Sequence, residues 1–183
     1  MIAQIWGNVA HKIRYEGAPL LPLIPLRRDP KKPRHEPPKA PIPAGWQTST
    51  DLTGLDSLAI LARKHPHSGM GLVLGARTRY ISLDPDGAEA QAEVARRRGR
   101  GELPPTWEYQ TWRGAQRQIY LLPADWTGPA PTTPLWTGEG EHEELRIQAD
   151  GSQCAIPPTK GYLWLPGRAY WEGPCAVAPD WML

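Results

Sequence analysis

The chain has 183 residues, enough for one domain with a buried core, and its formal net charge of +2 gives little reason by itself to expect a polyanionic partner. It contains no apolar run near the roughly 18 residues of a membrane span and no opening signal-like segment, so we expect a cytoplasmic protein without membrane contact. Cys154 and Cys175 do not combine with the five histidines in a finger-like spacing, which excludes a zinc finger and favours reduced thiols.

The first third of the chain predicts two helices and a strand. Apolar residues at helical spacing over residues 2–15 predict an opening amphipathic helix that ends at Gly17. Residues 19–26 are apolar but interrupted by prolines, which is typical of an edge strand. After a basic, proline-rich loop, Asp51 is a candidate N-cap for a second helix that ends near His65.

The remaining part alternates short strands with one further helix. Alanine and glutamate predict a helix over residues 88–98, closed by Gly99. Strands are expected at residues 69–75, 79–83, 107–111, 117–122, 144–147, 153–156, 161–164 and 169–171. The fold class is therefore α+β or mixed α/β, with a mostly antiparallel sheet and flanking helices.

Two carboxylates one residue apart end the strand at 79–83. If the strand continues, Asp84 and Asp86 share a face, with Cα atoms about 6.5–7 Å apart. Carboxylates so placed can bind Mg²⁺ or Mn²⁺, as two-metal phosphoryl transfer requires. The alternative is a simple turn, because Asp-Pro and Asp-Gly are common turn dipeptides.

Short motifs follow one another along the chain in a recognisable order. They are Pro22-Leu23-Ile24-Pro25, Lys31-Lys32-Pro33, Gly45-Trp46, Asp84-Pro85-Asp86, Thr111-Trp112-Arg113-Gly114, Pro157-Pro158-Thr159 and Tyr162-Leu163-Trp164. In this order they resemble the bifunctional DNA primase/polymerase (prim-pol) domain of plasmid and phage replication proteins, in the archaeo-eukaryotic primase superfamily. The resemblance implies a single catalytic domain over residues 1–183 with an RRM-like core, divisible into lobes of about 1–75 and 76–183.

The resemblance also implies site residues. Asp84, Asp86 and Glu144 would be the catalytic carboxylates and would hold two Mg²⁺ or Mn²⁺ ions, with Glu143 and Asp150 as alternatives for the third carboxylate. The family usually has a histidine after the glycine turn, near the incoming triphosphate; here Gln118 is the best positional match and Arg117 a charged substitute. The triphosphate would therefore be bound by Arg113, Arg117 and Gln118.

The implied activity is that of a DNA primase and DNA polymerase in replication or repair priming. Its partners would be a single-stranded DNA template, deoxyribo- or ribonucleoside triphosphates and a helicase. Basic clusters supply candidate template contacts at Lys31, Lys32, Arg96 and Arg97, although such clusters are also common on ordinary solvated surfaces. Two other functions stay open: a non-catalytic module that binds single-stranded DNA or nucleotide, and a metal-dependent nuclease that uses the same carboxylates.

Overall fold

A computed structural model describes residues 21, 23–33, 35–42, 45–47 and 68–183. The helices expected over residues 2–15 and after Asp51 lie outside these residues. The chain divides into two compact units: one holds Met1–Val73 together with Gln153–Leu163, and the other holds Leu74–Ser152 together with Trp164–Leu183. The first unit thus takes in a returning segment near the C-terminus that the sequence had assigned to the second lobe.

The first unit contains a four-stranded sheet in the order β2-β1-β3-β9. Its strands are β1 (Leu23–Arg27), β2 (Ala40–Pro41), β3 (Gly69–Val73) and β9 (Gln153–Ile156), and all of the pairings are antiparallel. The prolines around Leu23 led us to expect an edge strand, but β1 lies between β2 and β3. The two-residue β2 covers only the end of β1. Pro25 lies just beyond that pairing, opposite Met70 of β3, and its carbonyl still accepts the backbone N–H of Ile42 at 3.0 Å, so its missing N–H costs little.

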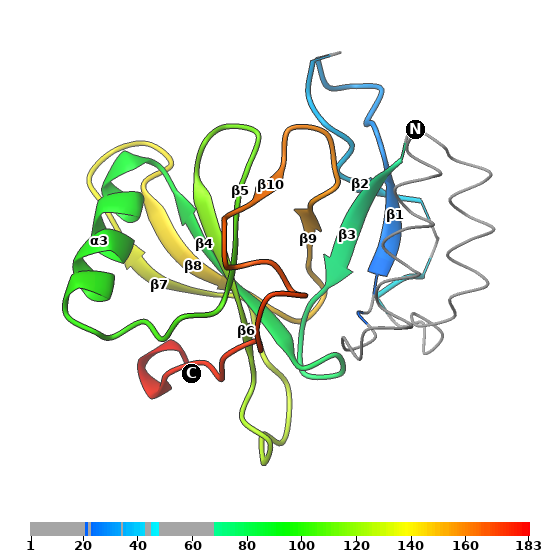
Figure 1. Cartoon of the computed structure of the whole chain (residues 1–183). Coiled ribbons are helices and arrows are strands. Elements are labelled where there is room, and N and C mark those ends of the chain that lie inside the picture. Colours follow the sequence, from blue (N-terminus) through cyan, green and yellow to red (C-terminus); the bar gives the residue numbers. More distant parts are fainter. Residues whose placement is uncertain (1–20, 22, 34, 43–44, 48–67) are drawn as a thin grey trace. The chain divides into compact units, whose positions relative to one another are not determined.

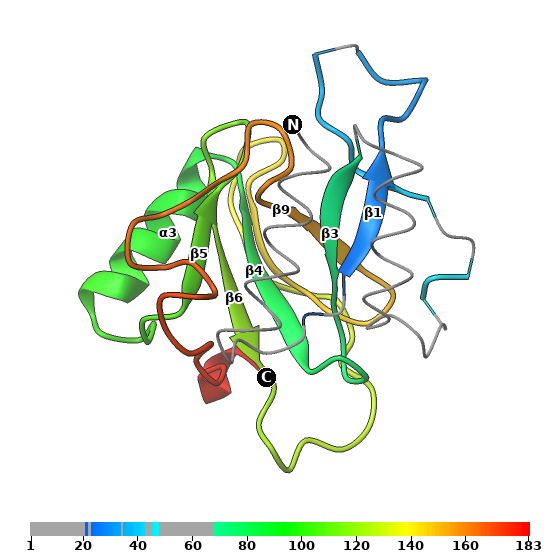
Figure 2. The ribbon, with the colours of Figure 1, turned by 45° about the vertical axis from the view of Figure 1, so that its right-hand side comes forward.

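The second unit contains a six-stranded sheet in the order β10-β5-β6-β4-β8-β7. Its strands are β4 (Tyr80–Asp86), β5 (Trp107–Gln110), β6 (Gln116–Leu121), β7 (Thr133–Thr137), β8 (Glu144–Gln148) and β10 (Leu163–Trp164). Helix α3 (Ala88–Gly99) lies against one face, over β4 and β8, and the short 3-10 helix η1 (Asp180–Met182) ends the chain (Figure 1). Figure 2 shows β5, β6 and β4 side by side, with α3 next to them.

Two sequence expectations in this unit were wrong. Residues 169–171 form a turn instead of a strand, because Glu172 and Ala169 bond each other through both backbone and side chain. Conversely, β7 lies between the strands expected at 117–122 and 144–147, in a proline-containing stretch where no strand was expected. It is the outermost strand, where Pro134 needs no partner for a missing N–H.

Alternation along the strands separates the two faces of this sheet. Ile81 and Leu83 of β4, with Leu145 and Ile147 of β8, pack in one buried cluster that also includes Ala90 and Val94 of α3; all six are buried. Burying a side chain of this size contributes about 1.5–3 kcal/mol. The intervening residues of β4 and β8 therefore face away from α3.

In the part of the chain that the structure describes, the fold is mainly β, with mostly antiparallel sheets and one α-helix. The antiparallel sheets agree with the expectation. The α+β class with flanking helices agrees only loosely, because α3 is the one α-helix among the described residues.

Candidate functional site

Both aspartates of the acidic motif lie within β4, which runs through Pro85 to Asp86 before Gly87 turns the chain into α3. Their backbone pairs with β8 over its full length, so they are strand residues and not the corners of a turn. Asp84 is 4% exposed, whereas the side chain of Asp86 is about half exposed. The motif therefore presents one buried and one accessible carboxylate on the face opposite α3.

The register between β4 and β8 decides what surrounds this pair. Asp84 lies directly opposite Arg146, and Asp86 lies directly opposite Glu144. Directly opposed residues of an antiparallel pair project on the same face, with Cβ atoms about 4.5–5.5 Å apart. Three carboxylates and one arginine are thus brought together by two neighbouring strands.

The guanidinium of Arg146 contacts all three carboxylates. Its Nε lies 3.7 Å from Asp84 Oδ2, its Nη2 lies 3.4 Å from Asp86 Oδ2, and its Nη1 lies 3.5 Å from Glu144 Oε2. Each distance exceeds the 2.7–2.9 Å or so of a short charge-assisted hydrogen bond. The arginine is therefore shared among the acids and is not forked onto one of them.

The buried Asp84 has further partners on both oxygens. Arg117 of β6 places Nη2 2.5 Å from Asp84 Oδ1, and Gln148 of β8 donates a hydrogen bond from Nε2 to Asp84 Oδ2 at 2.6 Å. Arg117 and Arg146 are largely buried, with side chains 21% and 32% exposed. Asp84 is consequently held between two arginines and an amide.

Gln118 is the residue that the sequence favoured as the substitute for the missing histidine, but it lies on the other face. It is opposite Leu83 in the pairing of β6 with β4, is 2% exposed, and donates a hydrogen bond to Glu108 Oε1 at 2.8 Å. The same Glu108 oxygen also contacts Arg98 at 2.6 Å. Because side chains alternate along a strand, position 117 and not position 118 lies beside the acidic motif.

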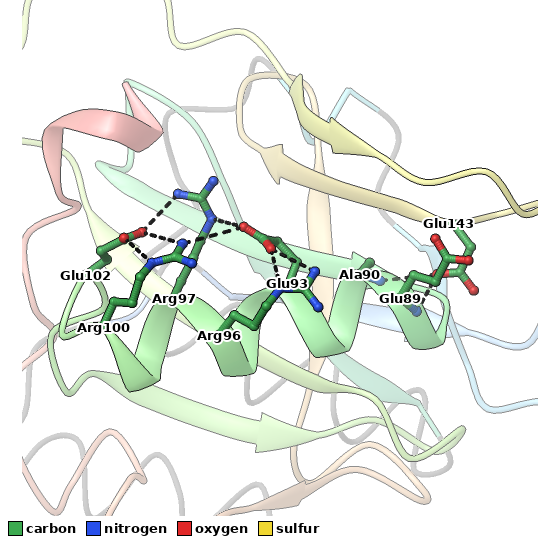
Figure 3. A network of polar contacts seen from close by, with 8 residues as sticks. All are labelled: Glu89, Ala90, Glu93, Arg96, Arg97, Arg100, Glu102 and Glu143. Carbon is green, nitrogen blue, oxygen red and sulfur yellow. Dashed lines mark hydrogen bonds and ion pairs between the residues drawn. The ribbon is translucent and has the colours of Figure 1, made fainter.

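Glu143, one of the alternatives for the third carboxylate, caps helix α3. Its carboxylate accepts hydrogen bonds from the backbone N–H groups of Ala88 (2.9 Å), Glu89 (2.7 Å) and Ala90 (3.1 Å), as Figure 3 shows in part. A Cβ at Gly87 would collide with this carboxylate, and the φ of Gly87 is +93°. The glycine after the acidic motif is therefore required by the cap, which satisfies N–H groups that every helix start leaves unpaired.

Asp150, the other alternative, is also engaged elsewhere. Its Oδ1 accepts the backbone N–H of Ala76 at 2.8 Å and its Oδ2 accepts that of Ala130 at 2.6 Å. A side chain at Gly75, whose φ is +116°, would strike this aspartate. Of the three alternatives, Glu144 alone joins Asp84 and Asp86.

The arginines of α3 have acidic neighbours. Arg96 and Arg97 both contact Glu93, at 2.9 Å and 2.8 Å, and Arg97 also contacts Glu102 at 3.3 Å (Figure 3). Burial acts to raise the pKa of Glu93, but hydrogen bonds and charge from the two arginines outweigh it and hold this pKa below its ordinary value. These arginines lie at the end of α3 away from the acidic motif, about 15 Å along the helix.

The other candidate cations are exposed. Arg113 lies on the turn between β5 and β6, with its guanidinium 5.0 Å from the ring centre of Trp112. Lys31 and Lys32 lie on an exposed turn of the first unit, where Asp29 accepts the backbone N–H of Lys31. Arg113 belongs to the same hairpin as Arg117, and the structure therefore brings these two together with the carboxylates in one unit.

An aromatic cluster occupies the same face of the second unit. Tyr109 of β5 lies opposite Arg117 in register and packs edge-on against Trp164 at 5.5 Å. Trp171 follows at 6.2 Å from Trp164 and is 42% exposed. Tyr109 is fully buried and belongs to the core, whereas the exposed Trp171 at the far end of the cluster presents a ring of the kind on which bases stack.

Sequence reasoning missed Arg146 and Gln148. Both belong to a detectable pattern, because Glu144, Arg146 and Gln148 alternate with the apolar Leu145 and Ile147 and thus mark one polar face of a strand. What the pattern lacks is the register with β4, which sets Arg146 opposite Asp84.

The donor set does not fit two divalent ions. Among the described residues, no group of three or more histidine, cysteine, aspartate or glutamate side chains is arranged to hold a metal ion. The three carboxylates carry three negative charges, and Arg117 and Arg146 already offset two of them at 2.5–3.7 Å. Two divalent cations in their place would meet two fixed positive charges at close range.

The second unit is thus a mostly antiparallel sheet backed by a helix, with a strand-borne Asp-x-Asp motif, paired arginines and aromatic rings on the face away from α3. A family model described as "Bifunctional DNA primase/polymerase, N-terminal" matches residues 10–181. The chain belongs to this prim-pol family. No curated protein and no solved structure matched it in the same comparisons. None of the helices that the structure describes is long and apolar enough to cross a membrane.

Proposed function

We propose that this chain is a prim-pol domain that binds single-stranded DNA and a nucleoside triphosphate during replication or repair priming, without itself joining nucleotides. Family membership supports the substrates. The antiparallel sheet with α3 on one face is compatible with the RRM-like core and flanking helices that we expect of such domains.

The position of Arg117 beside the acidic motif is the observation that supports nucleotide binding. This arginine emerges from β6 and is fixed there by Asp84, with its side chain 21% exposed. Arg113 is exposed on the adjoining turn. Guanidinium groups bind phosphates through paired N–H donors, so the two arginines suit a triphosphate chain, while the exposed ring of Trp171 suits a base.

The pairing of the carboxylates favours binding over turnover. Two-metal nucleotidyl transfer needs carboxylates that are available to ions, and Asp84 has both oxygens engaged by Arg117, Arg146 and Gln148. Template-directed DNA synthesis is the second candidate. It is favoured by the convergence of Asp84, Asp86 and Glu144 from two adjacent strands.

Primer extension and de novo priming on single-stranded DNA, with labelled deoxy- and ribonucleotides in Mg²⁺ and separately in Mn²⁺, test the proposal together with fluorescence anisotropy of a labelled oligonucleotide. We expect no incorporation, with salt-sensitive binding of DNA and of nucleoside triphosphate. Metal-dependent product that disappears in an Asp84→Ala, Asp86→Ala protein would replace the proposal with the polymerase. Template shortening in metal without added nucleotide would identify a nuclease, and absence of all binding would reject the first two functions.

A further inference from the structure

We propose that Arg146 is a built-in cation that takes the place of a divalent ion among Asp84, Asp86 and Glu144, so that this domain assembles its carboxylates without metal. The inference explains how the proposed binding function would arise and rests on that function only for its biological meaning. The proposal itself concerns only which cation the three carboxylates bind.

The position of Arg146 is set by the backbone. Antiparallel pairing places its Cα opposite that of Asp84, and the next residue on the same face of β8, Glu144, is opposite Asp86. An arginine at this point must extend over the acidic pair or leave toward solvent. It extends over the pair, and its side chain is only 32% exposed.

The contacts are those of a central counter-ion. Each of the three guanidinium nitrogens approaches a different carboxylate, and the distances fall in the narrow range of 3.4–3.7 Å. A guanidinium that binds a single carboxylate forms two short parallel bonds with it instead. The guanidinium donates one long hydrogen bond, from Nη2 to Asp86 Oδ2 at 3.4 Å, and its buried Nε has no hydrogen-bond partner. Attraction to the whole group of acids therefore acts together with this one bond to hold the guanidinium in place.

Charge determines the consequence. With Arg117 and Arg146 present, the three carboxylates keep one unit of net negative charge, which attracts a divalent ion only weakly. An ion that entered would also stand close to the guanidinium of Arg146, and this repulsion is strong in a partly buried site. Removing the charge at position 146 leaves two units of negative charge and space for an ion, with carboxylate oxygens that Mn²⁺ and Mg²⁺ prefer.

Binding of Mn²⁺, followed by the electron paramagnetic resonance signal of the free hydrated ion, tests the inference on the full chain. We expect no saturable binding by the natural protein below about 1 mM, and a single site in Arg146→Gln that is at least about tenfold tighter. Arg146→Lys keeps the charge and should behave like the natural protein. Adding Asp84→Asn to Arg146→Gln should abolish the new site.

Arg77→Gln is the matched control, because it removes one positive charge from an exposed position of the same unit and should leave Mn²⁺ binding unchanged. Saturable micromolar binding by the natural protein overturns the inference and requires no variant. Equal affinity in Arg146→Gln and the natural protein also overturns it. DNA binding, measured on the same proteins in chelator, reports separately on the proposed function, since its loss leaves the Mn²⁺ result intact.

Discussion

Arg146 lies directly opposite Asp84 in the pairing of β4 with β8, and the guanidinium is shared with Asp86 and Glu144. An aspartate and an arginine therefore depend on each other on the face of the sheet away from α3. The stability of the fold and the chemistry of the site are coupled at this point.

Asp84→Asn should destabilise the second unit. The substitution leaves Arg117 and Arg146 partly buried without their shared carboxylate, and breaking such a pair costs about 2 kcal/mol or more. Asp86→Asn is the matched control, because the side chain of Asp86 is 49% exposed and has one contact at 3.4 Å. Urea unfolding should show a clear loss for the first and little change for the second; equal losses would contradict the central role of Asp84.

Arg117→Ala should weaken nucleoside triphosphate binding by about tenfold or more, because it removes a charge-assisted phosphate donor. Gln118→Ala tests the neighbouring position, which faces Glu108 and the helix side of the sheet. It should lower stability without changing nucleotide affinity. Isothermal titration at fixed salt measures both, and a larger affinity loss at position 118 would overturn the assignment of faces.

Glu143→Ala should cost about 1–2 kcal/mol of unfolding free energy, the usual range for losing a helix N-cap. The carboxylate also favours the positive end of the helix dipole. Glu139→Ala, at an exposed position of the same loop, should be near neutral. Thermal unfolding measures the difference, and equal effects of the two substitutions would rule out the cap as a stabilising contact.

Arg96→Gln with Arg97→Gln should leave affinity for single-stranded DNA nearly unchanged, because these arginines lie in the last turn of α3, at the end away from the acidic motif. Lys31→Gln with Lys32→Gln should weaken binding and reduce the dependence of log affinity on log salt by roughly 1–2. Anisotropy titrations over a salt series distinguish the pairs. If the dependence of log affinity on log salt fell only in the arginine variant, the template contacts would be assigned to Arg96 and Arg97 instead of Lys31 and Lys32.

Cys175 should resist thiol reagents in the folded protein. Burial raises its pKa to about 12, and the hydrogen bond with Thr106 only partly opposes this. The thiol therefore stays protonated at pH 8, whereas an exposed thiol near its ordinary value of 9.0 is partly ionised. Because the unfolded chain ionises first, stability should fall as pH rises above about 9. Native labelling as fast as labelling in denaturant would contradict this.

Local patterns were sufficient for most elements of the second unit. Alanine and glutamate before Gly99 predicted helix α3, and the turn at Gly114 predicted the hairpin of β5 and β6. The antiparallel class followed from the number of short strands. By contrast, β7 was missed because proline has a low strand propensity, and the sequence does not show that this strand lies at the edge of the sheet, where proline is tolerated.

The site was predictable only in part, since sequence gives the alternation within one strand but not the register between two. Asp84 and Asp86 could be placed on one face from their spacing. The shift of one residue between Arg117 and Gln118 needed the observed pairing of β6 with β4, and a one-residue shift sends a side chain to the opposite face. The roles of Glu143 and Asp150 depend on contacts with backbone groups far away along the chain.

Glu143 and Glu144 are consecutive, yet one secures the start of α3 and the other faces Arg146. In the preceding loop, the exposed side chains of Glu139 and Glu141 can be replaced without disturbing Glu143 or Glu144, whereas a side chain at Gly138 or Gly140 would meet Glu143. Adding or deleting one residue next to Glu143 and Glu144 would shift the register, so that one glutamate would stand where the other is needed. Positions 139 and 141 should therefore vary in residue type far more freely than the loop varies in length, and a library of insertions and deletions should recover folded protein least often at the junction of the loop with β8.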